Sequence, residues 1–271
     1  MWQLSLSILC SALIGNLLIL FKRDPRRDIL LIFLGNYFLA TIFSLATNEH
    51  SLSRIGSAEL ILGGLGGIFF LVNFLIYQKN ITQNGLSLSA GMMRVSLIIP
   101  TFVSLVLFSE KIGSAAYLGI VTVLAAFIFL TNARSYQNFF WLVILFVITG
   151  VTDTILKLYD ETGSQQPGLF MIILFAAAFS GNLILVFQKR RSFNLRYFIY
   201  GMILGIPNQM TTRFFLGALE SVPAAVVYPL FAAGVVALCF LTDIFLWKKK
   251  YRIRERWGIL MLIIGIILLN I

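Results

Sequence analysis

Charged residues are scarce in this sequence. Only 12% of the 271 residues are Asp, Glu, Lys or Arg and 59% are hydrophobic, whereas about 25% of a soluble domain is charged. Histidine occurs once, at His50, and cysteine twice, at Cys10 and Cys239 inside apolar runs. These low counts argue against a soluble domain, a disulfide framework and most schemes of acid–base catalysis.

Motifs of enzymes and of nucleotide-binding proteins are missing as well. The sequence has no nucleophile elbow, no metal-ligand spacing and no cluster of histidine with carboxylates. The glycine-rich stretch GGLGG at 63–67 follows no strand and precedes no phosphate-loop lysine, so we interpret it as a site of close helix approach. We therefore expect no enzymatic activity, no metal site and no cofactor.

Long polar segments are absent, and apolar runs of about 20 residues take their place. A run of this length crosses a hydrocarbon core of roughly 30 Å as a helix, and the runs lack the alternation of a barrel strand. The first run has neither the basic start nor the cleavage site of a signal peptide. We predict an all-α polytopic membrane protein with ten transmembrane helices, at about 2–21, 28–47, 57–77, 86–108, 113–132, 138–158, 167–188, 195–217, 223–247 and 254–271.

Lysine and arginine are distributed unevenly between the loops. The net charge is +10, with 16 basic residues in the odd-numbered loops, four in the even-numbered loops and their flanks, and Arg94 inside a segment. The positive-inside rule places the odd-numbered loops in the cytoplasm and both termini outside a cell inner membrane. This distribution accounts for the basic charge without a nucleic acid as partner.

The second half of the sequence repeats the first. A shift of 139 residues lays the third, fourth and fifth segments on the eighth, ninth and tenth without a gap, and Gly66 falls on Gly205. Each half has five crossings, which is an odd number, so the halves must be inverted relative to each other. We predict two inverted five-helix repeats, at 1–132 and 133–271, as is typical of alternating-access transporters with a midplane site.

One stretch resembles a known family. The run RVSLIIPTFVSLVLFSEKIGSAAYLGIVTVLAAFIFL at 94–130 has a helix with a proline, then a glutamate, a short loop and a glycine-containing apolar helix. In this order, and with GNYFLA at 35–40, the chain resembles EamA-type members of the drug/metabolite transporter superfamily. The second copy keeps Pro229 and Gly258, but Lys249 stands where the first copy has Glu110.

The resemblance implies a transporter of small organic solutes. Amino acids, organic anions, sugars, nucleotide derivatives and amphipathic drugs are the substrates of such proteins, and coupling ranges from proton antiport to exchange and uniport. Many relatives have both termini in the cytoplasm, opposite to the orientation that the charges predict here. The resemblance extends over the whole chain, although its motifs are loose.

Arg94 is the charged residue that the segment pattern places deepest. It lies about eight residues into the fourth segment, roughly 12 Å from the cytoplasmic end, where a charge costs at least about 2.5–3.5 kcal/mol. It should therefore face the interior of the bundle. We expect it to bind a carboxylate or phosphate of the substrate as a bidentate fork, with a structural role through backbone carbonyls or snorkelling as the alternative.

Asp153 and Lys157 are four residues apart on the sixth segment, so they share one face of a helix. Burial raises the pKa of a carboxylate, and Asp153 is thus our candidate for carrying a coupling proton, with Lys157 beside it. The alternative is a local ion pair between the two near the outer interface.

Other polar residues interrupt the apolar segments singly or in pairs. Each either binds substrate or forms a hydrogen bond to a neighbouring helix, and the amides after Pro207 lie where a missing backbone donor kinks the helix. The candidates for substrate binding, besides Arg94, are Asn16, Tyr37, Asn73, Asn208, Gln209 and Tyr228.

These patterns together predict a transporter that moves a small organic metabolite across the cytoplasmic membrane, in the direction of export, as a monomer or homodimer. Its partners are the substrate, the lipid bilayer and a coupling proton. A proton-coupled exporter of cationic amphipathic drugs is the first alternative. An integral-membrane enzyme on lipid-linked substrates, or a scaffold or receptor, is less consistent with the missing carboxylate pairs and the short loops.

Overall fold

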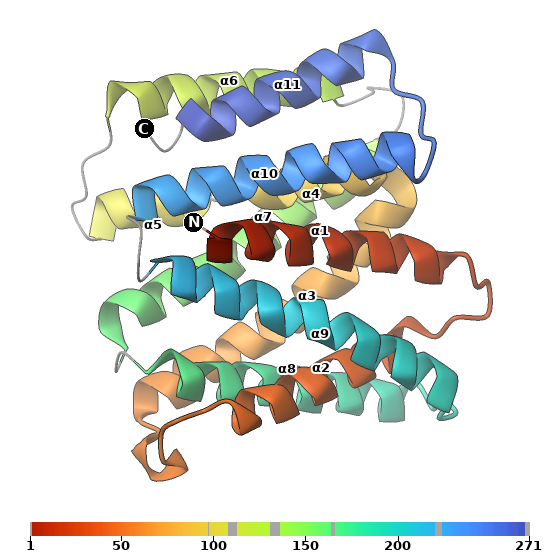
Figure 1. The fold of residues 1–271 in the computed structure, drawn as a ribbon, viewed down its shortest axis with the longest axis vertical. Helices are drawn as coiled ribbons and strands as arrows, with labels where there is room; N and C mark the ends of the chain where they lie inside the picture. The colour runs from red at the N-terminus through yellow and green to blue at the C-terminus, as the bar shows by residue number, and fades with distance from the viewer. Residues whose placement is uncertain are drawn as a thin grey trace. The chain divides into compact units, whose positions relative to one another are not determined.

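The computed structural model describes residues 2–96, 98–107, 113–130, 136–163, 166–219 and 224–268 (Figure 1). Within these ranges all regular secondary structure is helical. The elements are α1 (Trp2–Lys22), α2 (Ile29–Ala46), a 3-10 turn η1 (Leu52–Arg54), α3 (Ser57–Asn84), α4 (Leu86–Val95), α5 (Ile98–Leu107), α6 (Ser114–Leu130), α7 (Tyr136–Thr162), α8 (Pro167–Gln188), α9 (Leu195–Leu219), α10 (Ala224–Phe245) and α11 (Ile253–Leu268).

The predicted apolar segments agree with these helices to within about four residues at each end, except at the third and fourth segments. The third was expected to end at 77, but α3 continues to Asn84. One helix was expected over 86–108, and the structure has two, α4 and α5. The N–H of Ser96 closes the end of α4 by donating to the carbonyl of Met92. Pro100 lies in the first turn of α5, where its missing N–H breaks no intrahelical bond, whereas in a continuous helix it would leave the carbonyl of Ser96 without a donor.

Several helices have the length and composition of membrane spans. Within the described residues, α1, α2, α3, α8 and the stretch Asn138–Tyr159 of α7 are each at least 18 residues long and strongly apolar. Large hydrophobic side chains also remain exposed on the surface, such as Phe187 and Ile184 on α8. The chain therefore has the apolar helices of a membrane-embedded protein.

The helices divide into two compact units that do not follow the halves of the sequence. Unit 1 consists of Met1–Ile19, Ile76–Gly150 and Met210–Ile271, and unit 2 of Leu20–Leu75 and Val151–Gln209. Helices α3, α7 and α9 each contribute one part to unit 1 and the other to unit 2. Both units therefore combine helices from 1–132 with helices from 133–271.

In unit 2, α2 packs along α8 and also meets the first part of α9 at very short range. A Cβ on Gly35 of α2 would overlap the carbonyl oxygen of Phe198, and a Cβ on Gly201 of α9 would overlap that of Ile32. With glycine at these two positions, the backbones of α2 and α9 can lie in direct contact. Beside them lies a cluster of aromatic rings with centroids 5.4–6.4 Å apart, formed by Phe33, Tyr37, Phe70, Phe74 and Phe175.

In unit 1, α6 and α11 lie side by side, and α10 packs against both α4 and α11 (Figure 1). Small residues at these contacts allow close packing: a Cβ on Gly91 of α4 would come within 2.8 Å of Leu262 on α11. The buried side chains of this core come from α4, α6, α10 and α11 together with Tyr251. The core of unit 1 thus combines helices that are far apart in the sequence.

The close contact of α2 and α9 at Gly35 and Gly201 leads to a prediction about the stability of the protein. Gly201→Ala places a methyl group against the carbonyl of Ile32, which belongs to a helical backbone and cannot move aside cheaply. We expect thermal unfolding in detergent to show a loss of about 1–3 kcal/mol. Gly64→Ala on α3 is the control, because nothing lies within 4 Å of its Cβ and alanine favours helix by up to about 1 kcal/mol. Equal stability of the two variants would contradict the close approach.

Candidate functional site

Arg94 lies in the last turn of α4 and connects three helices of unit 1. Its Nη2 donates a hydrogen bond of 2.9 Å to the Oγ of Ser11 on α1, and its guanidinium carbon lies 4.4 Å from the centre of the Phe231 ring on α10. The side chain is half-buried. A hydrogen bond from a charged donor and a cation–π contact both stabilise a guanidinium that has left water. The residue thus faces the helices of unit 1, as the sequence predicts.

Asn16 joins α1 to the end of α10. Its Oδ1 accepts a 2.6 Å hydrogen bond from the indole N–H of Trp247, and its Nδ2 donates to the hydroxyl of Thr242 at 3.2 Å and to the carbonyl of Ala12 at 2.8 Å. Of the two roles considered for Asn16, these contacts favour a hydrogen bond between helices.

A buried carboxylate, Asp243, lies one residue beyond Thr242 on α10. It is 2% exposed, accepts a hydrogen bond from the hydroxyl of Tyr251 and lies 3.9 Å from the Nζ of Lys249. Lys249 also donates to the carbonyl of Asn84 at 3.5 Å. Gly85 leaves room for this lysine, because a Cβ there would collide with its Nζ. Gly85 also has φ +89°, a conformation that glycine adopts easily.

Lys249 is the residue at which the second sequence copy departs from the first. The contacts with Asp243 and Asn84 give it a structural role in unit 1. The lysine that stands where the first copy has Glu110 therefore forms an ion pair with Asp243, a buried acid in the same stretch of the chain.

Tyr77 on α3 and Cys239 on α10 belong to the same part of unit 1 as the arginine and the acid. Both are close enough to Arg94 and to Asp243 to interact with them electrostatically. Both are buried. We call the resulting group the unit-1 polar cluster; its members are Ser11, Asn16, Tyr77, Arg94, Cys239, Thr242 and Asp243.

Amides of α8 and α9 form hydrogen bonds between helices in unit 2, among them the predicted residue Asn208. The Nδ2 of Asn208 donates to the Oδ1 of Asn36 on α2 at 3.2 Å, and the Nδ2 of Asn182 on α8 donates to the carbonyl of Leu30 at 2.8 Å. Such bonds hold helices together inside a membrane. For Asn208 they favour a structural role.

Tyr37, Asn73 and Gln209 are also buried in unit 2. The hydroxyl of Tyr37 donates to the carbonyl of Phe70 at 3.4 Å, and the side chains of Asn73 and Gln209 are 4% and 2% exposed. The structure does not bring these three to Arg94 within one unit, because Arg94 belongs to unit 1. The side chain of Tyr228 lies outside the described residues.

Asp153 and Lys157 lie on the part of α7 that belongs to unit 2. The Nζ of Lys157 forms an ion pair of 2.6 Å with the Oε1 of Glu161, one turn further along the helix. Asp153 is half-buried. The predicted proton-carrying acid and the predicted substrate arginine are thus in different units.

Two buried acids were missed by reasoning from sequence. One is Asp243, which interrupts the apolar run CFLTDIF and could have been found by that signal alone. The other is Glu59, which is fully buried near the start of α3. It accepts from the N–H of Gly56 at 2.9 Å and from the hydroxyl of Tyr159 at 3.1 Å. These bonds close the start of α3 in the manner of a capping box, which assigns Glu59 a structural role.

Comparison with known proteins supports the fold and gives no activity. No family model matches the chain. An uncharacterized protein of Haemophilus influenzae is 23% identical over an alignment of 268 positions that covers 92% of this chain and 91% of that protein. A crystal structure, described only as that of a protein, superposes with a TM-score of 0.70 at 15% identity and covers 98% of this chain and 96% of its own. At this identity the likeness concerns the fold alone.

The hydrogen bond from the hydroxyl of Tyr251 to the buried carboxylate of Asp243 leads to a testable prediction. Tyr251→Phe removes a donor from the carboxylate of Asp243, and a hydrogen bond to a charged group contributes about 1.5–3 kcal/mol. We expect a loss of stability of that size in thermal unfolding. Tyr117→Phe on α6 is the matched control, because the Tyr117 side chain is 60% exposed. The same midpoint for both variants would show that Tyr251 does not stabilise the acid.

Proposed function

We propose that this chain is a multi-pass transporter of the EamA type. It moves a small organic metabolite with a negative group across the cytoplasmic membrane by alternating access, in the direction of export. Of the classes considered, amino acids, organic anions, nucleotide derivatives and those sugars that carry an acidic group meet this description. The observation that carries the proposal is the placement of Arg94, a charged residue held by α1, α4 and α10 within unit 1.

The helix boundaries support the two inverted repeats on which alternating access depends. When the chain is shifted by 139 residues, the starts of α2, α3, α4 and α6 fall within one residue of the starts of α8, α9, α10 and α11. Three of these equivalent pairs are also in direct contact: α2 packs on α8, α4 on α10 and α6 on α11. Equivalent helices meet in this way when they lie around a pseudo-two-fold axis.

The glycine contacts in unit 2 follow the same symmetry. Gly66 on α3 and Gly205 on α9 are equivalent positions. Gly66 faces the side chains of Ile155 on α7 and Leu174 on α8, whereas Gly205 approaches the carbonyl of Asn36 on α2. Each glycine thus lies against one of the two equivalent helices α8 and α2, although the atoms in contact differ. This agreement between sequence and packing supports the repeat.

The break between α4 and α5 supports a substrate site beside Arg94. Discontinuous helices are typical of the binding sites of transporters, where half-helix N-termini carry partial positive charge toward anionic groups. Here Arg94 is in the last turn of α4, and α5 begins four residues later. A guanidinium and a helix N-terminus each favour a carboxylate or phosphate as ligand.

A second function, the proton-coupled export of cationic amphipathic drugs, is favoured by one observation. Asp243 is a buried carboxylate in the same unit as Arg94, and a buried carboxylate attracts a cation. We therefore add Asp243 to Asp153 as a candidate for coupling.

Transport by Arg94 variants tests the proposal. Purified protein is first screened by thermal shift against amino acids, organic acids, sugars, nucleotide sugars and cationic drugs, because a ligand of the folded state raises its stability. Uptake of the stabilising solute is then measured in proteoliposomes. We expect Arg94→Ala to lower uptake about tenfold or more, as the loss of a charged hydrogen bond implies.

Two further variants make the Arg94 result specific. Arg94→Lys keeps the charge but lacks the planar fork, so it should retain part of the uptake. Arg213→Ala removes an exposed arginine of unit 1 and should leave uptake unchanged. If the stabilising solutes are cationic, or if Arg94→Ala transports as well as the wild type, the anionic-substrate proposal fails.

The coupling acid is identified by a pH gradient across the same proteoliposomes. Asp243→Asn keeps an oxygen that can accept from Tyr251 but cannot release a proton. We expect this variant to lose uptake driven by the gradient while it retains exchange of labelled for unlabelled solute at equal pH. Asp153→Asn is the parallel variant in unit 2. Loss of gradient-driven uptake in Asp153→Asn alone would return the role to Asp153.

A further inference from the structure

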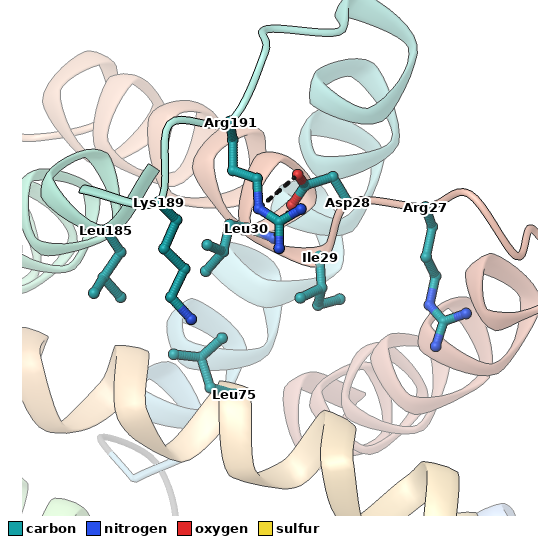
Figure 2. A pocket seen from close by; sticks show the side chains of 8 residues that line it. All are labelled: Arg27, Asp28, Ile29, Leu30, Leu75, Leu185, Lys189 and Arg191. Carbon is teal, nitrogen blue, oxygen red and sulfur yellow. Dashed lines mark hydrogen bonds and ion pairs between the residues drawn. The ribbon is translucent and has the colours of Figure 1, made fainter. Parts of the chain in front are cut away.

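A small cavity lies in unit 2, where the basic loop before α2 meets the end of α8. It has a volume of about 220 Å³, below the roughly 300–1,000 Å³ of pockets for drug-sized ligands. A cavity of this size suits a single polar group rather than a whole metabolite. Figure 2 shows its lining side chains, which are Arg27, Asp28, Ile29, Leu30, Leu75, Leu185, Lys189 and Arg191.

The polar part of the lining carries an excess of positive charge. Arg191 is paired with Asp28, with 3.4 Å between its Nε and the Oδ2 of the carboxylate (Figure 2). Arg27 donates to the carbonyl of Lys22 at 2.9 Å, so its charge is held by neutral oxygen rather than by an acid. Within the described part of the chain no carboxylate forms an ion pair with Lys189. Two positive charges thus remain, which favours an anion.

The rest of the lining is apolar. Leu30, Leu75 and Leu185 supply hydrocarbon surface, and in Figure 2 the amine of Lys189 points toward Leu75. The outer face of α8 next to this point has two strongly exposed apolar side chains, Ile184 at 54% and Phe187 at 72%. In a membrane-embedded helix such side chains contact lipid. The cavity therefore combines cations with a path to the hydrocarbon.

The backbone at the end of α8 is held so that two of the cations line this cavity. Arg190 has φ +47°, a left-handed conformation that costs a non-glycine residue roughly 1 kcal/mol. Its N–H donates to the carbonyl of Phe187, and the N–H of Arg191 donates to that of Val186, as in a Schellman cap. This cap reverses the chain between Lys189 and Arg191, both of which line the cavity.

We propose that this cavity binds the phosphate group of an anionic phospholipid. The uncompensated charges of Arg27 and Lys189 attract the phosphate, and the three leucines accept the first carbons of the lipid. Basic pockets between membrane helices on the side rich in lysine and arginine bind lipid head groups in this way. A soluble phosphate would match the cations equally well but would gain nothing from the leucines, which is why a lipid is the better ligand.

Lipid binding to the full-length protein in detergent tests this site. Native mass spectrometry measures the occupancy of phosphatidylglycerol and of phosphatidylcholine with the same acyl chains. The wild type should prefer phosphatidylglycerol. The double variant Arg27→Gln/Lys189→Gln should lose affinity for that lipid by about fivefold for each charge removed and keep its affinity for phosphatidylcholine.

A matched control and an opposite variant separate a site from general surface attraction. Lys250→Gln/Arg256→Gln removes the same two residue types from exposed positions outside the cavity, and it should change phosphatidylglycerol binding less than twofold. Asp28→Asn removes the only acid of the lining, while asparagine preserves the cap that Asp28 provides to the N–H of Leu30. This variant should bind phosphatidylglycerol more tightly. Such a gain in affinity cannot result from loss of the fold, so it tests the role of the cavity charge directly.

Three outcomes would overturn the proposal. One is an equal loss in the exposed control, which would mean attraction by the whole basic surface. Another is a failure of the wild type to distinguish the two lipids. The third is equal thermal stabilisation by inorganic phosphate at the same concentration, which would identify a soluble anion as the ligand. None of these readouts depends on transport, so the lipid site stands or falls independently of the proposed function.

Discussion

Close approach of helix backbones is the constraint on which unit 2 depends. In a membrane the helices gain little by burying apolar side chains against each other, because lipid chains are equally apolar. Contact area and short-range bonds must hold them together instead. Gly35 and Gly201 admit each other's helix from both sides, and only at this distance can the amide of Asn208 reach Asn36. The hydrogen bond between Asn208 and Asn36 is thus a consequence of the glycines.

Much of the fold could be predicted from the sequence, because each membrane span is a local property. A run of about 20 apolar residues has few other structures in lipid. The predicted segments agree closely with the helices except at 86–108 and at the end of 57–77, where α3 continues to Asn84 through polar residues that hydropathy assigns to a loop. The prediction of a single fourth helix was wrong, although the sequence contains a local signal against it. Pro100 was noted as a family feature, but its missing donor also ends a helix near Ser96, which the run of apolar residues conceals.

The composition of the candidate site could be predicted only in part. The charge of Arg94 identified it as an interior residue, since lipid exposure would be too costly. The partners of Arg94 and Asn16 could not be predicted, because Ser11 and Trp247 are 83 and 231 residues away in the sequence. Which polar side chains meet depends on how helices from both halves combine in one unit, and hydropathy carries no information on that. Asp243 was overlooked for a simpler reason, because it is a single charged residue within an otherwise apolar run.

The contacts of Arg94 define what a substrate must do there. Placing a charge inside the bundle costs at least about 2.5–3.5 kcal/mol. The bond to Ser11 returns about 1.5–3 kcal/mol, and the Phe231 ring returns about 0.5–2 kcal/mol. These two contacts offset much of the cost of placing the guanidinium there, so under the proposed function an incoming carboxylate competes with them. The net free energy of binding is the difference between the new contacts with the carboxylate and the contacts that they replace, so binding should be weak. Weak binding would suit the proposed transport function, in which the chain must release on one side what it bound on the other.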